Sequence, residues 1–354
     1  MNSLGSDHEI CEATGISGSF RTIQIHPTLR CNLLCKHCYS SSSPVFKTGL
    51  ESERLLRFIQ YAERKGFNAI SLSGGEPLMY RELDKVVQFA KSLGMRTGMV
   101  SNGMLLGSEF AGKVLESVDI VAISIDGEPE WHDYMRGQKG AFQHTLRGIE
   151  ILRNLHKPFG FIHTITSKSW ESLIWLADFA VSQGARLLHL HPVENSGRAS
   201  TEMSDYMLND TIRYKIFILT EYLRNKYSCR LEIQLDLSHR DYIKENPEVV
   251  RFYNPDNSSL ADRLEKSMNN IVVDEKGDIY PISYGISSKF RIGSIYQRSF
   301  EGMFERFLEE KGRYLDTLLS RTYDMIVHDE SVDMVSWGEM IVEQSLQSSD
   351  LMTV

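Results

Sequence analysis

Short apolar segments alternate with helical segments through the first two-thirds of the chain, and this alternation sets the fold class. Helical patterns follow the strands at residues 51–65, 141–154 and 171–183, and another helix is expected after Tyr80. Parallel strands need such crossovers, which are right-handed, so we predict a parallel sheet with helices behind it. Six strand–helix units make an α/β fold of the partial (β/α)6 TIM-type barrel class rather than a closed eight-fold barrel. The strand candidates are residues 21–27, 69–73, 97–101, 119–125, 160–166 and 186–192.

The alternation ends after residue 199, and the remaining chain has another pattern. A hairpin is expected within residues 271–280, turning at Glu275-Lys276-Gly277. The other expected elements are a helix at 211–226, strands at 230–237 and 290–296, and a helix at 300–310. We therefore predict an N-terminal segment at residues 1–20, the barrel at 21–199, and a smaller α+β C-terminal extension with a helical tail at 200–354.

The charge and hydropathy of the chain exclude some classes of partner. A net charge of −8 argues against nucleic acid as the main substrate, because phosphate binding relies on clustered Lys and Arg. No apolar run approaches the ~20 residues that cross a bilayer. Asp7, His8 and Glu9 lie where a signal peptide would have a basic flank and an apolar core. We expect a cytoplasmic protein without nucleic-acid or membrane partners.

Three cysteines, Cys31, Cys35 and Cys38, lie within eight residues directly after the first strand. Four protein ligands usually bind a structural zinc ion or a ferredoxin-type cluster, but no fourth cysteine lies nearby. His37 lies between two of the cysteines and is expected to point elsewhere. Three thiolates would leave one iron of a cluster open to a substrate or cofactor. A structural zinc site, or three unrelated buried thiols, is the alternative reading.

The spacing C-x3-C-x2-C resembles the signature of the radical S-adenosylmethionine (SAM) superfamily, and later motifs agree with it. Ser73-Gly74-Gly75-Glu76-Pro77 resembles the GGE motif of that family. Gly74 and Gly75 would let the backbone approach a ligand, and Glu76 would accept hydrogen bonds from the methionine ammonium. The resemblance implies one [4Fe–4S] cluster on the three cysteines, which reductively cleaves SAM to a 5′-deoxyadenosyl radical.

Further polar residues at strand ends are assigned through the same resemblance. Arg136 resembles an arginine that pairs with the methionine carboxylate. His163 and His191 are expected to line the cavity, with His191 near the adenine, although a structural hydrogen-bonding role for these histidines is also open. His189 and His191 share one face of their strand. The residues expected to contact the ribose and the methionine carboxylate are Ser101, Asn102, Ser124 and Asp126.

The C-terminal extension resembles the SPASM or twitch extension of radical SAM enzymes that modify peptides. Residues 271–281 and 292–295 carry this resemblance, but Ile282 stands where family members place a cysteine. No cysteine follows Cys229, so we expect no auxiliary cluster. A generic hairpin and helix is the alternative. Cys11 and Cys229 are expected to be inert, or Cys229 donates a hydrogen atom to a substrate radical, as in peptide epimerases.

The sequence around the cysteines resembles maturases of ribosomally made peptides with Nif-type leaders. Some of these are spliceases, which excise a tyrosine-derived tyramine and leave an α-keto-β-amino acid, and we rank this reaction first. Peptide epimerisation and carbon–carbon crosslinking to a cyclophane come next, and a radical SAM enzyme for a small molecule or a non-enzymatic metal protein remains open. Only about twenty residues precede the first strand, too few for a fused recognition domain. We expect a precursor peptide as substrate, a separate leader-recognition protein, and a reductant such as flavodoxin or ferredoxin.

Overall fold

The computed structural model describes residues 20–251 and 268–347. Residues 1–19, which include Cys11 and nearly all of the expected N-terminal segment, lie outside this described part. One ten-stranded sheet runs through the molecule in the order β11-β10-β9-β1-β2-β3-β4-β5-β6-β7. Its strands are β1 (Thr22–Ile25), β2 (Ala69–Leu72), β3 (Arg96–Ser101), β4 (Ile120–Ser124), β5 (Phe159–Ile165), β6 (Leu187–Pro192), β7 (Glu232–Leu235), β9 (Asn270–Val273), β10 (Asp278–Pro281) and β11 (Gly293–Ser294).

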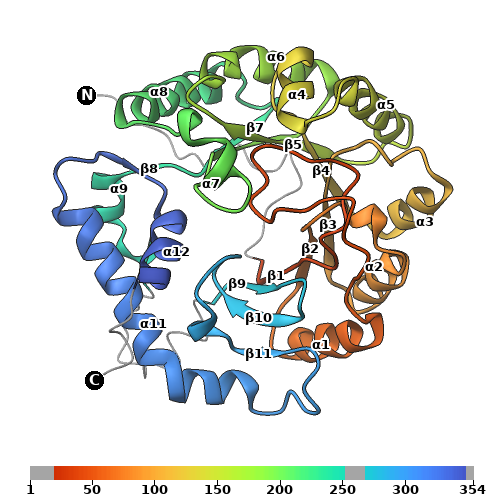
Figure 1. The fold of residues 1–354 in the computed structure, drawn as a ribbon, viewed down its shortest axis with the longest axis vertical. Helices are drawn as coiled ribbons and strands as arrows, with labels where there is room; N and C mark the ends of the chain where they lie inside the picture. Colours follow the sequence, from red (N-terminus) through yellow and green to blue (C-terminus); the bar gives the residue numbers. More distant parts are fainter. Residues whose placement is uncertain (1–19, 252–267, 348–354) are drawn as a thin grey trace.

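Helices cover the outer face of this sheet, while the strands curve around the centre of the molecule (Figure 1). Each predicted strand–helix unit is present, which confirms the partial TIM-type barrel. The outer helices are α1 (Ser52–Arg64), α2 (Leu83–Ser92), α3 (Glu109–Ser117), α4 (Pro129–Arg136), α5 (Ala141–Asn154), α6 (Leu173–Gln183) and α8 (Asp210–Lys226); α7 (Ala199–Glu202) is a short turn.

The sheet continues past residue 199, where we expected the barrel to end. Strand β7 pairs in parallel with β6, with Leu188 opposite Ile233. Strands β9 and β10 form the expected antiparallel hairpin, but β9 also pairs in parallel with β1, with Ile23 opposite Ile271. The C-terminal region therefore supplies strands to both edges of the barrel sheet, in addition to a short two-stranded ribbon of its own.

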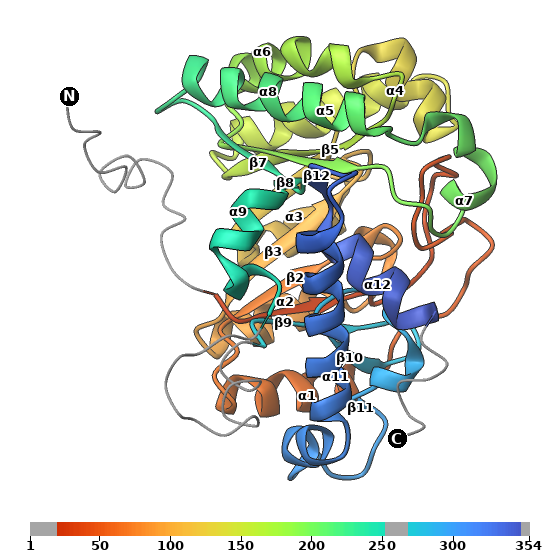
Figure 2. The ribbon, with the colours of Figure 1, turned by 90° about the vertical axis from the view of Figure 1, so that its left-hand side faces the viewer.

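The remaining C-terminal elements close the side of the ring that the sheet leaves open. The long helix α11 (Met303–His328) and helix α12 (Trp337–Gln347) stand across this side (Figure 2). Helix α9 (Arg240–Glu245) and a two-stranded ribbon of β8 (Ser238–His239) and β12 (Met334–Val335) connect them to β7. Between β7 and β11, the two edge strands of the sheet, the ring is thus closed by helices and not by strand pairing.

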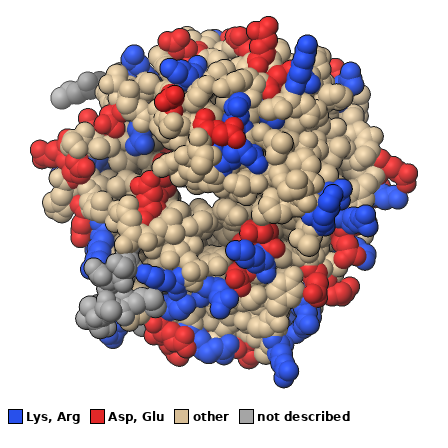
Figure 3. Space-filling view, viewed as in Figure 1, with Lys and Arg blue, Asp and Glu red and all other residues tan. Residues whose placement is uncertain are grey.

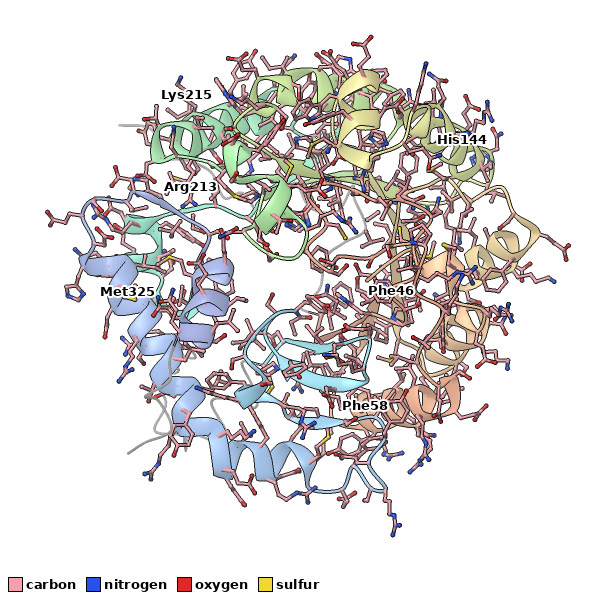
Figure 4. All side chains as sticks on the ribbon, viewed as in Figure 1. Phe46, Phe58, His144, Arg213, Lys215 and Met325 are labelled. Atoms are coloured by element: carbon pink, nitrogen blue, oxygen red, sulfur yellow. The ribbon has the colours of Figure 1, made fainter. Side chains whose placement is uncertain are left out.

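Apolar side chains between sheet and helices form one continuous core. Phe58 on α1 is fully buried, and its ring lies 5.6 Å from that of Phe300, just before α11 (Figure 4). Burial of one such aromatic side chain contributes about 1.5–3 kcal/mol. The core therefore joins the first barrel helix to the C-terminal region. Among the described residues, no helix combines the length and apolarity that crossing a membrane requires.

Candidate active site

A cavity of about 530 Å³ lies at the carboxyl ends of the parallel strands. Figure 3 shows the face of the molecule open at its centre. Two sets of residues line this cavity. Those of the N-terminal wall include Cys31, Cys35, Cys38, Glu76, Asn102 and Arg136, and those of the C-terminal wall include His191, Glu194, Asp236, Tyr284, Trp337 and Glu339. Parallel α/β folds bind their ligands at this end of the strands.

The loop after β1 brings the three cysteines together at the cavity, as the sequence predicted. Arg198 holds this loop in place: its guanidinium donates to the carbonyl oxygens of Cys35 at 2.6 Å and Ser42 at 2.8 Å. The backbone N–H of Arg198 also donates to the Cys38 carbonyl at 2.9 Å. Gly197 permits this approach, because a Cβ there would lie 2.1 Å from the Tyr39 carbonyl oxygen. The Gly197-Arg198 pair therefore acts as a clamp on the cysteine loop.

The chemistry of the three thiols fits a metal cluster. Burial raises the pKa of Cys31 to about 12, and burial also raises the pKa of Cys35. Binding to a metal removes the thiol protons, and the positive charge of the metal then stabilises the three buried thiolates. No fourth cysteine lines the cavity within residues 20–251 and 268–347. The donor set thus matches a cluster that is bound through three thiolates.

Glu76 lies in the loop after β2, and several hydrogen bonds hold its carboxylate. Its carboxylate accepts from Ser101 Oγ at 2.9 Å and from the Asn102 backbone N–H at 2.9 Å. Burial raises the pKa of Glu76 to about 7 despite these donors. Gly75 allows the backbone to fold over the cysteine loop, because a Cβ there would lie 2.3 Å from the Arg30 carbonyl oxygen. Gly74, Gly75, Glu76, Ser101 and Asn102 all line the cavity, where the sequence placed them.

Asp126 and Arg136 form a buried ion pair. The distance from Arg136 Nε to Asp126 Oδ2 is 2.6 Å, and Arg136 Nη2 donates to Asp126 Oδ1 at 3.1 Å. Burial favours protonated Asp126, but Arg136 and the neighbouring His37 outweigh it and hold the pKa of Asp126 below its ordinary value. Arg136 lines the cavity and points Nη1 at Cys35 Sγ, 3.7 Å away. Asp126 is fully buried and outside the lining, so it positions Arg136 rather than facing a ligand.

The remaining predicted residues fall into two groups. Ser124 and His191 line the cavity. His163 is fully buried beneath it, and its Nδ1 contacts the Ile125 carbonyl oxygen at 3.0 Å, which matches the structural alternative for this histidine. His191 pairs with Asp236, a residue that sequence reasoning did not select.

Cys229 is not brought together with the other candidates. It is exposed in the turn between α8 and β7, at the amino end of that strand, with a positive φ of 66°. The cavity lies at the carboxyl ends, and Cys229 is not among its lining residues. The hydrogen-donor role expected for Cys229 would need contact with the cavity, and Cys229 has none.

Sequence reasoning also missed most of the C-terminal wall. Asp236, Trp337 and Glu339 belong to segments with no recognisable motif. Glu339 reaches the cavity from α12, and burial, with Glu194 nearby, raises its pKa to about 7. The one available signal was the placement of Asp236 near the end of the strand predicted at residues 230–237, at the end where ligands bind.

Comparison with known proteins agrees with this geometry. Residues 25–180 match the model of the Radical SAM superfamily. The AdoMet-dependent heme synthase of Methanosarcina barkeri (strain Fusaro / DSM 804) is 33% identical over 181 residues, 50% of this chain and 52% of that protein. The sporulation killing factor maturation protein SkfB of Bacillus subtilis (strain 168) is 28% identical over 221 residues, 62% of this chain and 53% of SkfB. This chain spans about half the length of these curated relatives.

A solved structure shares the fold over most of this chain. It is Streptococcus suis SuiB bound to the precursor peptide SuiA, with a TM-score of 0.63 at 15% identity, over 81% of this chain and 65% of that chain. This likeness concerns the fold. The family match, with the three cysteines, shows that residues 25–180 form a radical SAM domain, characteristic of a superfamily that uses a [4Fe–4S] cluster and S-adenosylmethionine.

Proposed function

We propose that this chain is a radical SAM enzyme that modifies a ribosomally synthesised precursor peptide. The observation that carries the proposal is the cavity of about 530 Å³ with its two walls. The N-terminal wall presents the cofactor motifs, and the C-terminal wall lines the rest of the same cavity. The opening on the surface suits a long substrate that inserts one side chain and leaves its flanks outside (Figure 3). The similarity to SkfB, a maturation protein, supports a peptide substrate.

The residues of the N-terminal wall have separate roles in this proposal. Cys31, Cys35 and Cys38 hold the cluster, and Arg136 pairs with the methionine carboxylate. Glu76, held by Ser101 and Asn102, accepts the methionine ammonium. When bound, the cluster and SAM supply a 5′-deoxyadenosyl radical. The protein orients the reacting groups and excludes water from them.

Within the peptide class we propose the splicease reaction, excision of a tyrosine-derived tyramine to leave an α-keto-β-amino acid. Its support is the resemblance of the sequence around the cysteines to maturases of Nif-type-leader precursors. The sequence has no cysteine after Cys229, which disfavours thioether-forming enzymes with auxiliary clusters. Epimerisation and carbon–carbon crosslinking are the alternatives within this class. The proposal includes a separate leader-recognition protein, a flavodoxin or ferredoxin as reductant, and a cytoplasmic location.

The experiment is anaerobic co-expression with the precursor peptide encoded beside this enzyme, followed by intact mass measurement. Loss of a tyramine unit is the expected result, and a Cys35→Ala enzyme provides the matched control. Loss of two hydrogens would replace the splicease by a crosslinking enzyme. An unchanged mass with deuterium uptake from heavy water would indicate an epimerase. An unchanged peptide without deuterium would overturn the peptide proposal.

A small-molecule substrate is the second candidate. The similarity to a heme synthase, at 33% identity, favours it specifically. Such an enzyme would need no leader-recognition protein and would convert a free metabolite. Conversion of a free tetrapyrrole by the purified enzyme, with the precursor peptide left intact, would establish this candidate over the first.

A further inference from the structure

Three ligand-type side chains meet at the C-terminal wall: two of them, His191 and Asp236, line the cavity, and the third, His189, lies beside them outside the lining. They are His189 and His191 on β6 and Asp236 directly after β7. His189 Nε2 lies 2.9 Å from Asp236 Oδ1, and His191 Nδ1 contacts Asp236 Oδ2. Their ligand atoms all lie within 4.8 Å of one another. His189 and Asp236 have no role in the SAM binding described above, and His191 has only the predicted contact with the adenine.

The sheet itself produces this convergence. Residues two apart on a strand point to the same face, which brings His189 and His191 side by side with ring centroids 3.9 Å apart. Strand β7 pairs with β6 so that Gln234 lies opposite His189, and the Asp236 backbone N–H donates to the Leu190 carbonyl at 3.0 Å. This backbone hydrogen bond fixes where the carboxylate enters the cavity. The three side chains are therefore positioned by paired strands and not by flexible loops.

We propose that His189, His191 and Asp236 bind a divalent first-row transition metal ion, of which Zn²⁺ is the best fit. Two imidazoles and one carboxylate form the donor set that such ions prefer, whereas Mg²⁺ and Ca²⁺ prefer oxygen donors alone. Metal–ligand distances of about 2.0–2.2 Å imply ligand atoms roughly 3.3 Å apart in a tetrahedral site. The three ligand atoms lie within 4.8 Å of one another, so binding a metal requires side-chain shifts on the order of 1 Å.

The surroundings of the three residues favour a cation. Glu194 and Glu339 also line this side of the cavity, and Glu194 lies close enough to Asp236, and Glu339 to Glu194, for the neighbouring carboxylate to raise the pKa of each glutamate further. A divalent ion would offset this charge. Three protein ligands leave at least one coordination position open toward the cavity, which is the arrangement of a metal that meets a substrate. A carbonyl or carboxylate oxygen of the substrate is the chemistry that would fill it.

The alternative is that hydrogen bonds alone, without a metal ion, hold His189, His191 and Asp236 together. Each imidazole can donate one hydrogen bond to Asp236, and the triad is then a hydrogen-bonded unit without metal. The two cases differ in one measurable quantity, the metal bound per chain. Metal binding at these three residues does not depend on which reaction the enzyme catalyses, so a failure of the peptide proposal would leave this inference intact.

The test uses the full-length protein with its cluster reconstituted anaerobically and kept oxidised. After chelator treatment, the protein is dialysed against micromolar Zn²⁺, and zinc and iron are measured by mass spectrometry. We expect one zinc per chain beyond the cluster iron. His191→Ala and Asp236→Asn should each weaken zinc binding at least tenfold. His144→Ala provides the matched control, because His144 is exposed on the outer helix α5, away from the cavity (Figure 4).

Zinc at the cysteine loop must be distinguished from zinc at the proposed site. Mn²⁺ serves for this purpose, because thiolates bind it poorly, and its paramagnetic signal reports the free ion. Wild-type protein should deplete that signal and His189→Gln should not, while iron content and circular dichroism stay unchanged. The proposal is overturned if the wild type binds neither ion, or if the three variants bind zinc as the wild type does.

Discussion

The two walls of the cavity differ in how their polar side chains are held. On the N-terminal wall, Glu76 and Arg136 are almost fully buried, and their charges are met by partners inside the protein. On the C-terminal wall, the side chains of His191 and Asp236 are 34% and 44% exposed. Buried, fully paired groups are preorganised for one ligand, whereas exposed groups remain available to whatever enters. The first wall therefore suits a fixed cofactor, and the second suits a substrate that varies between enzymes.

The largest effect should come from removing a cluster ligand on the N-terminal wall. Cys35→Ala leaves two thiolates, which cannot retain the cluster, so SAM cleavage should fall at least about a thousandfold, or roughly 4 kcal/mol. The measurements are bound iron and 5′-deoxyadenosine formed with dithionite. Cys229→Ala, in an exposed turn, should keep both values. Equal losses in the two variants would contradict the placement of the cluster.

The next largest effect concerns the guanidinium group of Arg136. Lysine keeps the charge but cannot contact Asp126 through two nitrogens and face Cys35 with a third. Arg136→Lys should weaken SAM binding about ten- to a hundredfold, or roughly 1.4–2.8 kcal/mol, as measured by equilibrium dialysis of the holoprotein. The matched control is Arg147→Lys on the exposed face of α5. Unchanged affinity would show that Arg136 is only a structural ion-pair partner.

A substitution on the C-terminal wall should separate the two functions. Trp337→Ala removes an aromatic side chain of this wall while leaving the N-terminal wall intact. Substrate conversion should fall about thirtyfold, or roughly 2 kcal/mol, with SAM affinity unchanged. The ratio of modified peptide to 5′-deoxyadenosine reports this uncoupling. Tyr214→Ala, exposed on α8, serves as control. A parallel loss of SAM binding would break the distinction between the walls.

The smallest effect is a pH dependence that belongs to the N-terminal wall. Because burial raises the pKa of Glu76 to about 7, this residue is neutral below pH 7 and a carboxylate above it. The SAM ammonium prefers the carboxylate, whose fraction rises about tenfold from pH 6 to pH 8, so affinity should rise by up to about tenfold. Titrations of Glu76→Gln account for the ionisation of the ligand itself. If this variant shows the same rise, Glu76 is not the titrating group.

The sequence was informative where function is carried by contiguous motifs. Cys31, Cys35 and Cys38 lie in one loop, and Glu76 and Asn102 each lie shortly after the end of a strand, so their meeting follows from a parallel sheet. Three features had no local signal. Arg198 clamps a loop that is more than 150 residues away in sequence. The pairing of β9 with β1 and the approach of Glu339 depend on long-range packing, which a periodicity does not encode.

The pairing of β9 with β1 also bears on the order in which the protein is made. Ile23 and Ile271 face each other across about 250 residues of chain. A ribosome that adds about 5–20 residues per second needs some tens of seconds to travel between them. Until then the strand that leads into the cysteine loop has one open edge, with unpaired backbone groups. This period ends when β9 pairs with β1. During synthesis the cysteine loop therefore lies for some time beside an incomplete sheet.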